Sequence, residues 1–150
     1  MFSRPVKISK LLSVNDTGEN STHQAGILVP KDSTILGFFP DLGKSEKNPR
    51  TIIRIQDEGG SLWDFAFIYY NNKFFSERGT RNEYRLTGMT KFMRANNAHA
   101  GDTLVFSRNE DGDYFVRLEK PEQKVSAVNE PDGKKRIRLT VSSSWKVISI

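Results

Sequence analysis

Short apolar segments, each bounded by turn-forming residues, run through most of the chain and restrict its fold more than any other feature. Strand-like segments cover residues 6–12, 24–29, 51–56, 62–70, 103–108, 114–119, 136–141 and 145–150. They do not alternate regularly with long helical segments, so a doubly wound parallel sheet is not indicated. The pattern predicts a mainly β chain.

Two segments between the strands have helical character. Pro30 is well placed to open a short helix over residues 31–39. In residues 89–96, Met89 and Phe92 fall on one apolar helical face. We therefore predict an antiparallel barrel of seven or eight strands, open or closed, whose ends are covered by two short helices.

The composition fits one domain over residues 1–150 and excludes several classes of site. A hydrophobic fraction of 36% supports a compact core, which ten Phe and four Tyr fill with bulky, β-compatible side chains. The chain has no cysteine, which excludes disulfide bonds, thiolate zinc sites and a cysteine nucleophile. With only two histidines present, we expect no metal and no cofactor.

The charge balance favours a polyanionic partner. The net charge is +5, and basic residues cluster in 78–85 and 134–138. No apolar run approaches the roughly 20 residues of a membrane span, and no signal-peptide core follows Met1. We expect a soluble intracellular protein with no membrane partner. The run 134–138 either touches phosphates or begins a solvated strand.

The run 80–85 carries the strongest chemical signal. In an extended segment Arg81, Glu83 and Arg85 project together, while Asn82 and Tyr84 project the other way. Arginine matches the O6 and N7 acceptors of guanine, and glutamate accepts from the N4 amine of cytosine. The alternative is a solvated strand whose charges pair with one another. The candidate DNA-binding residues here are Arg78, Thr80, Arg81, Asn82, Glu83, Tyr84 and Arg85.

A second polar segment follows the first strand. Asparagine and glutamine can read adenine, and lysine can hold a phosphate. The alternative is an exposed loop with local side-chain turns over residues 13–22. The candidate DNA-binding residues here are Lys10, Ser13, Asn15, Asp16, Thr17, Asn20, His23 and Gln24.

These motifs resemble a known family. Residues 10–18 (KLLSVNDTG), then 23–26 (HQAG) and Pro30, resemble the start of the EcoRII effector domain, and 68–71 (IYYN) with 80–85 resembles its second arm. Residues 84–89 (YRLTGM) and 100–106 (AGDTLVF) are similar to the plant B-three transcription-factor domain. Both belong to the DNA-binding pseudobarrels, and the resemblance covers about residues 10–117.

The resemblance implies a monomeric pseudobarrel that clamps double-stranded DNA from the major groove. It implies one arm near residues 10–23, a second near 78–85, and a CCWGG site, where W is A or T. The base readers carried over by motif position are His23, Arg81, Glu83 and Arg85. Lys10, Asn15, Asp16 and Thr17 belong to the first arm.

Three positions depart from the EcoRII pattern. Tyr84 replaces a basic residue, Gly79 replaces a lysine, and Leu28 replaces a tyrosine. EcoRII-type effector domains are attached to a nuclease domain that cuts the DNA, so we expect this chain to be a non-catalytic domain of a type IIE-like restriction endonuclease. A UbaLAI-like enzyme is one candidate parent, and the resemblance implies a bacterial or archaeal cytoplasm. Residues 142–150 form either a closing strand or a lead into a catalytic domain.

Other functions stay open at this point. A stand-alone DNA-binding domain of the transcription-factor kind would use the same arms. A metal-dependent nuclease would need carboxylates such as Asp41 and Glu122 with Lys124. A barrel that binds a protein or a small ligand would not retain DNA at physiological salt.

Overall fold

The computed structural model describes residues 6–19, 25–121 and 144–148. In this part of the chain, eight strands form one sheet in the order β2-β5-β4-β3-β7-β6-β1-β8. The strands are β1 (Lys7–Leu11), β2 (Gly26–Val29), β3 (Arg50–Gln56), β4 (Leu62–Tyr70), β5 (Glu83–Thr87), β6 (Thr103–Arg108), β7 (Tyr114–Glu119) and β8 (Trp145–Val147). The helices are α1 (Val14–Thr17), α2 (Ser33–Leu36), the 3-10 helix η1 (Asn72–Phe74) and α3 (Thr90–Ala95). The predicted mainly β pseudobarrel is confirmed.

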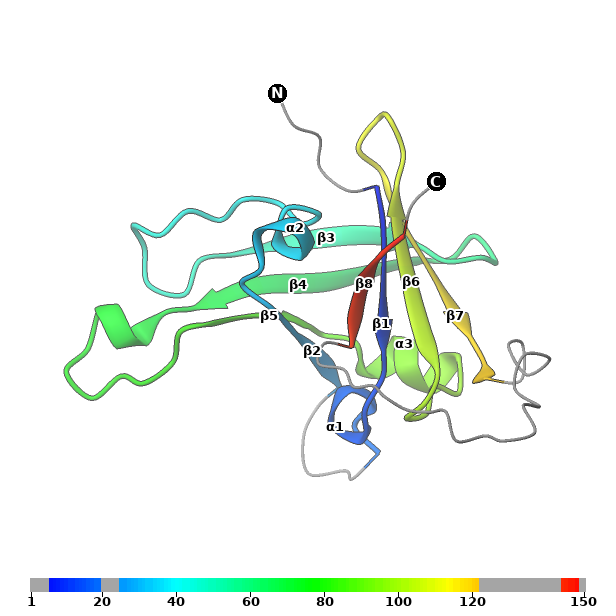
Figure 1. Ribbon diagram of the computed structural model, residues 1–150, viewed down its shortest axis with the longest axis horizontal. Coiled ribbons are helices and arrows are strands. Elements are labelled where there is room, and N and C mark those ends of the chain that lie inside the picture. The colour runs from blue at the N-terminus through cyan, green and yellow to red at the C-terminus, as the bar shows by residue number, and fades with distance from the viewer. Residues whose placement is uncertain (1–5, 20–24, 122–143, 149–150) are drawn as a thin grey trace, which may run out of the picture.

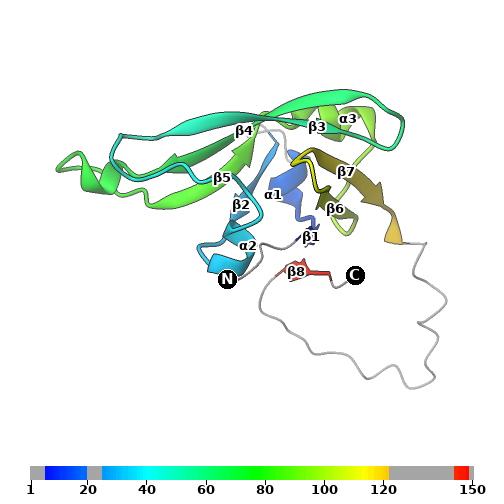
Figure 2. The same cartoon turned by 90° about the horizontal axis from the view of Figure 1, so that it is seen from above.

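The sheet is strongly curled. Figure 1 shows β3, β4 and β5 running across the molecule, with β1, β6, β7 and β8 standing across them. Figure 2 places α2 and β8 on the side opposite β3 and β4, so the curl encloses an interior. One pairing is parallel, between Ile55–Gln56 of β3 and Tyr114–Phe115 of β7. The predicted antiparallel arrangement therefore does not hold at this one seam, where the long connection through β4, β5, α3 and β6 makes parallel pairing possible.

Aromatic side chains fill the interior. Among the described residues, five phenylalanines are fully buried: Phe38, Phe65, Phe67, Phe92 and Phe106. Phe39 stacks on Phe67 with ring centroids 4.8 Å apart and meets Phe38 edge to face at 5.2 Å. Burying each such ring contributes about 1.5–3 kcal/mol, so the barrel is a packed core and not a pore.

Local capping decides where the short helices lie. The helix expected over residues 31–39 is only Ser33–Leu36, because the Asp32 side chain accepts from the Thr34 N–H at 2.8 Å and the chain then turns to bury its phenylalanines. The helix expected over 89–96 is present as α3. α1 was not expected, and the predicted strand 136–141 lies outside the described residues.

The two edge strands of the sheet are joined by a side chain. Trp145 on β8 donates its indole N–H to the Leu28 carbonyl on β2, at 3.1 Å. The same ring packs against Phe39 and Phe106, with centroid separations of 6.3 and 6.4 Å. β8 also pairs with β1, so this contact closes the curled sheet into a pseudobarrel.

We expect Trp145→Phe to lower the free energy of unfolding by about 1–2 kcal/mol. The change removes one hydrogen bond, worth about 1 kcal/mol, and part of a buried ring. Urea unfolding followed by the fluorescence of Trp63 measures it. Val147→Ala, on the same strand but 45% exposed, is the control and should cost less than about 0.5 kcal/mol. Equal losses in the two variants would contradict the closing role of Trp145.

Candidate nucleic-acid interface

β5 separates the core from an outer face at one edge of the barrel. Tyr84 and Leu86 are buried, whereas Glu83 and Arg85 lie on the outer face. The Asn82 side chain turns inward as well, since its Oδ1 accepts from the Tyr69 hydroxyl at 2.7 Å. The predicted alternation of the run 80–85 is therefore confirmed.

Tyr84 belongs to the core. Only 8% of it is exposed, and its ring stacks on Tyr69 with centroids 4.2 Å apart and planes 7° from parallel. Burial raises the pKa of Tyr84, which keeps the phenol neutral. We included Tyr84 among the candidate DNA contacts, but its buried ring supports the charged outer face from beneath. This also accounts for an aromatic residue where the EcoRII pattern has a basic one.

The charged side chains of the outer face form one cluster. Arg81 Nη2 lies 2.6 Å from Glu83 Oε2, and Arg85 Nη1 lies 3.6 Å from the same oxygen. Burial acts to raise the pKa of Glu83, but the hydrogen bond and charge of Arg81 and the charge of Arg85 outweigh it, so that pKa is lowered. The Arg81 guanidinium also lies 3.8 Å above the centre of the Tyr70 ring. Glu83 is therefore a carboxylate at neutral pH, and a cation–π contact with Tyr70 helps hold Arg81 in place.

If residues 80–85 were only a solvated strand, their charges would pair with one another, and this cluster contains such ion pairs as well. Such partly exposed pairs contribute only about 0–1 kcal/mol to stability. Arg81 keeps 43% of its side chain exposed, and Arg85 keeps 31%. Glu83 contacts one nitrogen of each guanidinium in these pairs, and a guanidinium has five N–H donors. Donors therefore remain for a further acceptor.

The second arm is the segment 71–85, which comprises the connection between β4 and β5 and the first residues of β5. Asn71 anchors its base: it is 1% exposed, and its Oδ1 accepts from the Asn48 N–H at 2.7 Å. In return Asn71 donates its N–H to Asn48 Oδ1 and its side-chain amide to the Glu46 carbonyl. Asn48 has a φ of +50°, a left-handed conformation that asparagine tolerates. The loop before β3 is thereby fastened to the second arm.

The two sides of the second arm are bonded to each other. The Asn72 side chain accepts from the Arg81 N–H at 2.9 Å, and the Arg81 carbonyl accepts from the Lys73 N–H at 3.1 Å. A Cβ built on Gly79 would lie 2.1 Å from the Asn72 carbonyl oxygen. The close approach requires glycine here, so the departure from a lysine at this position follows from the packing of the arm.

The far end of the second arm is exposed. Phe74 is 60% and Phe75 45% exposed, and the Lys73 ammonium lies 5.8 Å from the Phe74 ring centre. Arg78 and Thr80 are exposed as well. Composition alone assigns the phenylalanines to the core, so it does not predict that these two lie on the surface. Their position after Asn71-Asn72, beyond the end of a strand, is the signal that distinguishes them.

The first arm, described over residues 13–19, is built on α1 and not on a loop. The Ser13 hydroxyl accepts from the Asp16 N–H at 3.2 Å, and the Ser13 N–H donates to Asp16 Oδ2 at 2.9 Å, which is a capping box. The same Oδ2 accepts from Lys10 Nζ at 2.8 Å. Lys10 and Asp16 have 8% and 10% of their side chains exposed, so they form a buried ion pair.

Several predicted contact residues of the first arm therefore face inward. Lys10 is bound to Asp16 and to the Leu11 carbonyl, and the hydroxyl oxygen of buried Thr17 lies 3.1 Å from the Val14 carbonyl oxygen. These side chains shape the arm. Ser13 and Asn15 are exposed. The predicted residues Asn20, His23 and Gln24, and the basic run 134–138, lie outside the described residues.

The end of the first arm is attached to the segment before β6. Glu19 Oε1 accepts from the Ala100 N–H at 2.9 Å and from the Thr17 hydroxyl at the same distance. The hydrogen bond from Ala100 is the main cause of a lowered pKa for Glu19. The carboxylate thus holds α1 against the barrel wall.

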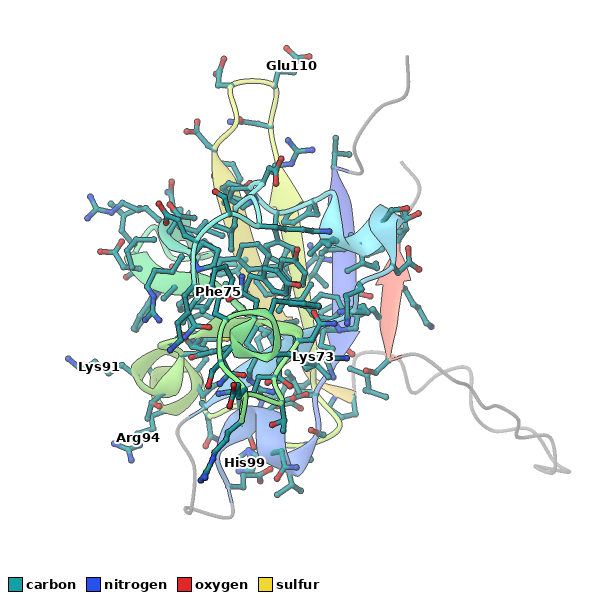
Figure 3. All side chains as sticks on the ribbon, turned by 90° about the vertical axis from the view of Figure 1, so that its left-hand side faces the viewer. Lys73, Phe75, Lys91, Arg94, His99 and Glu110 are labelled. Atoms are coloured by element: carbon teal, nitrogen blue, oxygen red, sulfur yellow. The ribbon has the colours of Figure 1, made fainter. Side chains whose placement is uncertain are left out.

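The two arms border one edge of the barrel. In Figure 1 the second arm extends to the left, α1 lies at the bottom, and β2 and β5 lie between them. Figure 3, viewed from that left side, shows Lys73 and Phe75 at the near end of the second arm, with His99 below. Leu28 on β2, 46% exposed, pairs with Arg85 and extends the outer face toward α1.

Among the described residues, no three His, Asp or Glu side chains gather in a way that could hold a metal ion. Asp41 is exposed, while Glu122 and Lys124 lie outside that part of the chain. No helix in the same ranges is long and apolar enough to cross a membrane.

Comparison with known proteins identifies the relatives of this architecture. The family described as "Restriction endonuclease EcoRII, N-terminal" matches residues 3–118. A B3 domain-containing transcription repressor of Arabidopsis thaliana is 33% identical over 107 residues, which are 71% of this chain and 12% of the repressor. The chain thus spans a small part of that relative.

Two solved structures share the fold. The Arabidopsis FUS3–DNA complex has a TM-score of 0.57 at 21% identity, covering 75% of this chain and 94% of that chain. The B3 domain of the UbaLAI restriction endonuclease, solved with its cognate DNA, has a TM-score of 0.55 at 18% identity, covering 97% of this chain and 87% of that chain. With the family match over residues 3–118, the chain belongs to the EcoRII N-terminal domain family and has the B3-type pseudobarrel fold.

Proposed function

We propose that this chain binds specific double-stranded DNA, with its second arm in the major groove. The observation that carries the proposal is the Arg81–Glu83–Arg85 cluster, held on a bonded arm whose charged groups face outward. The EcoRII family match and the two DNA-bound structures of the same fold support it.

The chemistry of the cluster fits neighbouring G·C pairs. Arg81 and Arg85 donate to guanine O6 and N7, and Glu83 accepts from a cytosine amine. Both guanidinium groups approach the same Glu83 oxygen, at 2.6 and 3.6 Å, so they lie close enough together to read adjacent base pairs. The cluster would thus read one half of a site of about five base pairs. A CCWGG-like site provides G·C pairs on both sides of a central A·T pair.

The first arm takes the other half of the site. We assign base or phosphate contacts to its exposed Ser13 and Asn15, and to Asn20, His23 and Gln24 beyond them. Arg78 and Thr80 of the second arm lie close to phosphates, where lysine and arginine contacts release counterions and make binding depend on salt. Lys10, Asp16, Thr17 and Tyr84 position these groups from beneath.

The biological role that fits this family is a DNA-sensing domain of a type IIE-like restriction endonuclease. In this role the chain is monomeric and does not cut, and an attached nuclease domain performs the cleavage. A transcription-factor-like domain is the second candidate, because a B3 transcription repressor is among the relatives. Incubating the chain with Mg²⁺ and a plasmid that carries the selected site tests the non-catalytic part, and specific cutting would contradict it.

Selection from a pool of random duplexes tests the binding function directly. The chain is mixed with the pool at physiological salt, and bound duplexes are amplified and sequenced. We expect enrichment of one site of about five base pairs that contains G·C pairs flanking an A·T pair. Retention of all duplexes alike, or of none, would contradict sequence-specific binding.

We expect Arg81→Ala to weaken binding to the selected site by about 1–3 kcal/mol and to relax the choice of base at one position. A gel-shift titration against the selected duplex and a scrambled duplex separates the two effects. Arg54→Ala is the matched control, since Arg54 is also exposed and paired with a carboxylate, Asp64, on the same sheet. If Arg81→Ala weakened binding to both duplexes equally, Arg81 would contact a phosphate and not a base.

A further inference from the structure

Two consecutive phenylalanines are exposed at the end of the second arm. Phe74 and Phe75, which we term the aromatic tip, expose 60% and 45% of their surfaces. Neither ring contributes to the core cluster, unlike Phe65 and Phe67 on the strand before them. A ligand that covered these two side chains would remove their apolar surface from water, which is favourable.

The aromatic tip is fixed relative to the arginine cluster. The Arg81 backbone is bonded on its N–H side to Asn72 and on its carbonyl side to Lys73, the two residues before the tip. The Phe74 and Phe75 N–H groups donate to the Asn71 and Asn72 carbonyls, each at 3.0 Å. A duplex placed against Arg81 therefore meets the tip at a fixed distance.

The charges around the tip favour a polyanion over a second copy of the chain. Lys73 lies over the Phe74 ring, Arg78 is exposed on the same arm, and Arg81 begins the cluster. Glu77 is exposed beside them, which leaves the segment 73–81 with a net positive charge. Two such tips brought face to face would repel each other, whereas the phosphates of a duplex would attract both.

The major groove offers one apolar group to such a surface. That group is the methyl at C5 of a pyrimidine, which thymine and 5-methylcytosine share, and phenylalanine is one of the residues that contact it. We propose that the aromatic tip contacts the C5-methyl group of a pyrimidine next to the guanine that Arg81 reads. This inference rests on the proposed DNA binding and adds a methyl-reading element to it.

Changes in the DNA that remove or add a single methyl group test the proposal. In the duplex selected above, each thymine in turn is replaced by deoxyuridine, which removes only the methyl group. We expect one replacement to weaken wild-type binding about 3- to 10-fold, the size of effect for losing one buried methyl contact. Phe74→Ser and Phe75→Ser should each bind the thymine duplex more weakly, and at least one of them should no longer distinguish thymine from deoxyuridine.

A matched protein control separates this effect from a general loss of exposed apolar surface. Leu62→Ser changes a side chain that is 59% exposed at the opposite end of β4. It should bind as wild type does and keep the full preference for thymine. Urea unfolding of the three serine variants should give the wild-type midpoint, because all three positions are exposed.

A second set of duplexes distinguishes the source of the methyl group. Each cytosine is replaced in turn by 5-methylcytosine. Tighter wild-type binding at one position, lost in a tip variant, would support the proposal with 5-methylcytosine as the source. An effect of deoxyuridine alone would support it with thymine as the source.

The remaining outcomes are decisive against the proposal. In two cases the tip does not read methyl groups: wild type binds the selected duplex but no methyl change alters its affinity, or the tip variants respond to the methyl changes as wild type does. The proposed function still stands in both cases. Loss of self-association in the tip variants during sedimentation, with unchanged methyl preference, would overturn the proposal in favour of a second copy. If wild type retains no specific duplex, the proposed function itself fails.

Discussion

Replacing Asp16 with alanine is expected to lower the free energy of unfolding by about 3–5 kcal/mol. The change leaves the Lys10 ammonium in a buried site without the carboxylate that lies 2.8 Å away, and removing one partner of a buried ion pair costs that much. It also removes the acidic half of the capping box at the start of α1. Urea unfolding of wild type and variant measures the loss.

A second variant separates the charge from the cap. Lys10→Met combined with Asp16→Ala removes both charges, so the double variant should regain most of the loss, apart from about 1 kcal/mol for the cap. A loss below about 1 kcal/mol for Asp16→Ala alone would show that Lys10 moves its ammonium into water and that the pair does not hold the first arm. Affinity for the selected duplex should fall together with stability in the single variant.

Gly79→Ala is expected to reduce specific DNA binding by about 100-fold or more while leaving the barrel folded. The new Cβ would lie 2.1 Å from the Asn72 carbonyl oxygen, a distance that no side chain can accept, so the two sides of the second arm must separate. Arg81 and Arg85 would then lose their common placement, and each lost guanine contact costs about 1–3 kcal/mol. A gel shift on the selected and scrambled duplexes gives the affinity.

Gly59→Ala is the control for this substitution. A Cβ at Gly59 would meet only the flexible Asp57 carboxylate, at 3.6 Å, so both binding and stability should match wild type. The thermal midpoint of Gly79→Ala should stay within a few degrees of wild type, since the second arm lies outside the aromatic core. Specific binding retained by Gly79→Ala would mean that the arm rearranges freely before it meets DNA.

The strands could be predicted from the sequence because their signals are local. The bounds of β4, β6 and β7 coincide with the predicted segments 62–70, 103–108 and 114–119, where apolar runs end at turn residues. The parallel pairing of β3 with β7 could not be predicted, because it depends on how two distant hairpins meet. Residues near α1 gave a loop signal since Ser, Asn and Asp favour turns and helix caps alike.

Some features of the candidate site could likewise be predicted from the sequence, and others could not. Alternation along an extended chain placed Arg81, Glu83 and Arg85 on one side, and the structure has them there. The buried state of Lys10 and Asp16 depends on packing that no short motif encodes. The opposite holds for Phe74 and Phe75. Composition suggests that they lie in the core, and only their position beyond the end of a strand indicates that they are exposed.

The contact between Trp145 and Leu28 fixes the relative position of the two walls of the barrel. The first arm is bonded to the wall that contains β6, through Glu19, and the second arm grows from β4 and β5 in the other wall. The distance between the two arms therefore depends on how the edge strands β2 and β8 meet around the packed aromatic rings. In the proposed complex, where each arm binds one half-site, one inserted base pair would shift a half-site by about 3.4 Å, more than a close-packed interior absorbs. The length of DNA accepted in that complex is then a property of the core, far from any base.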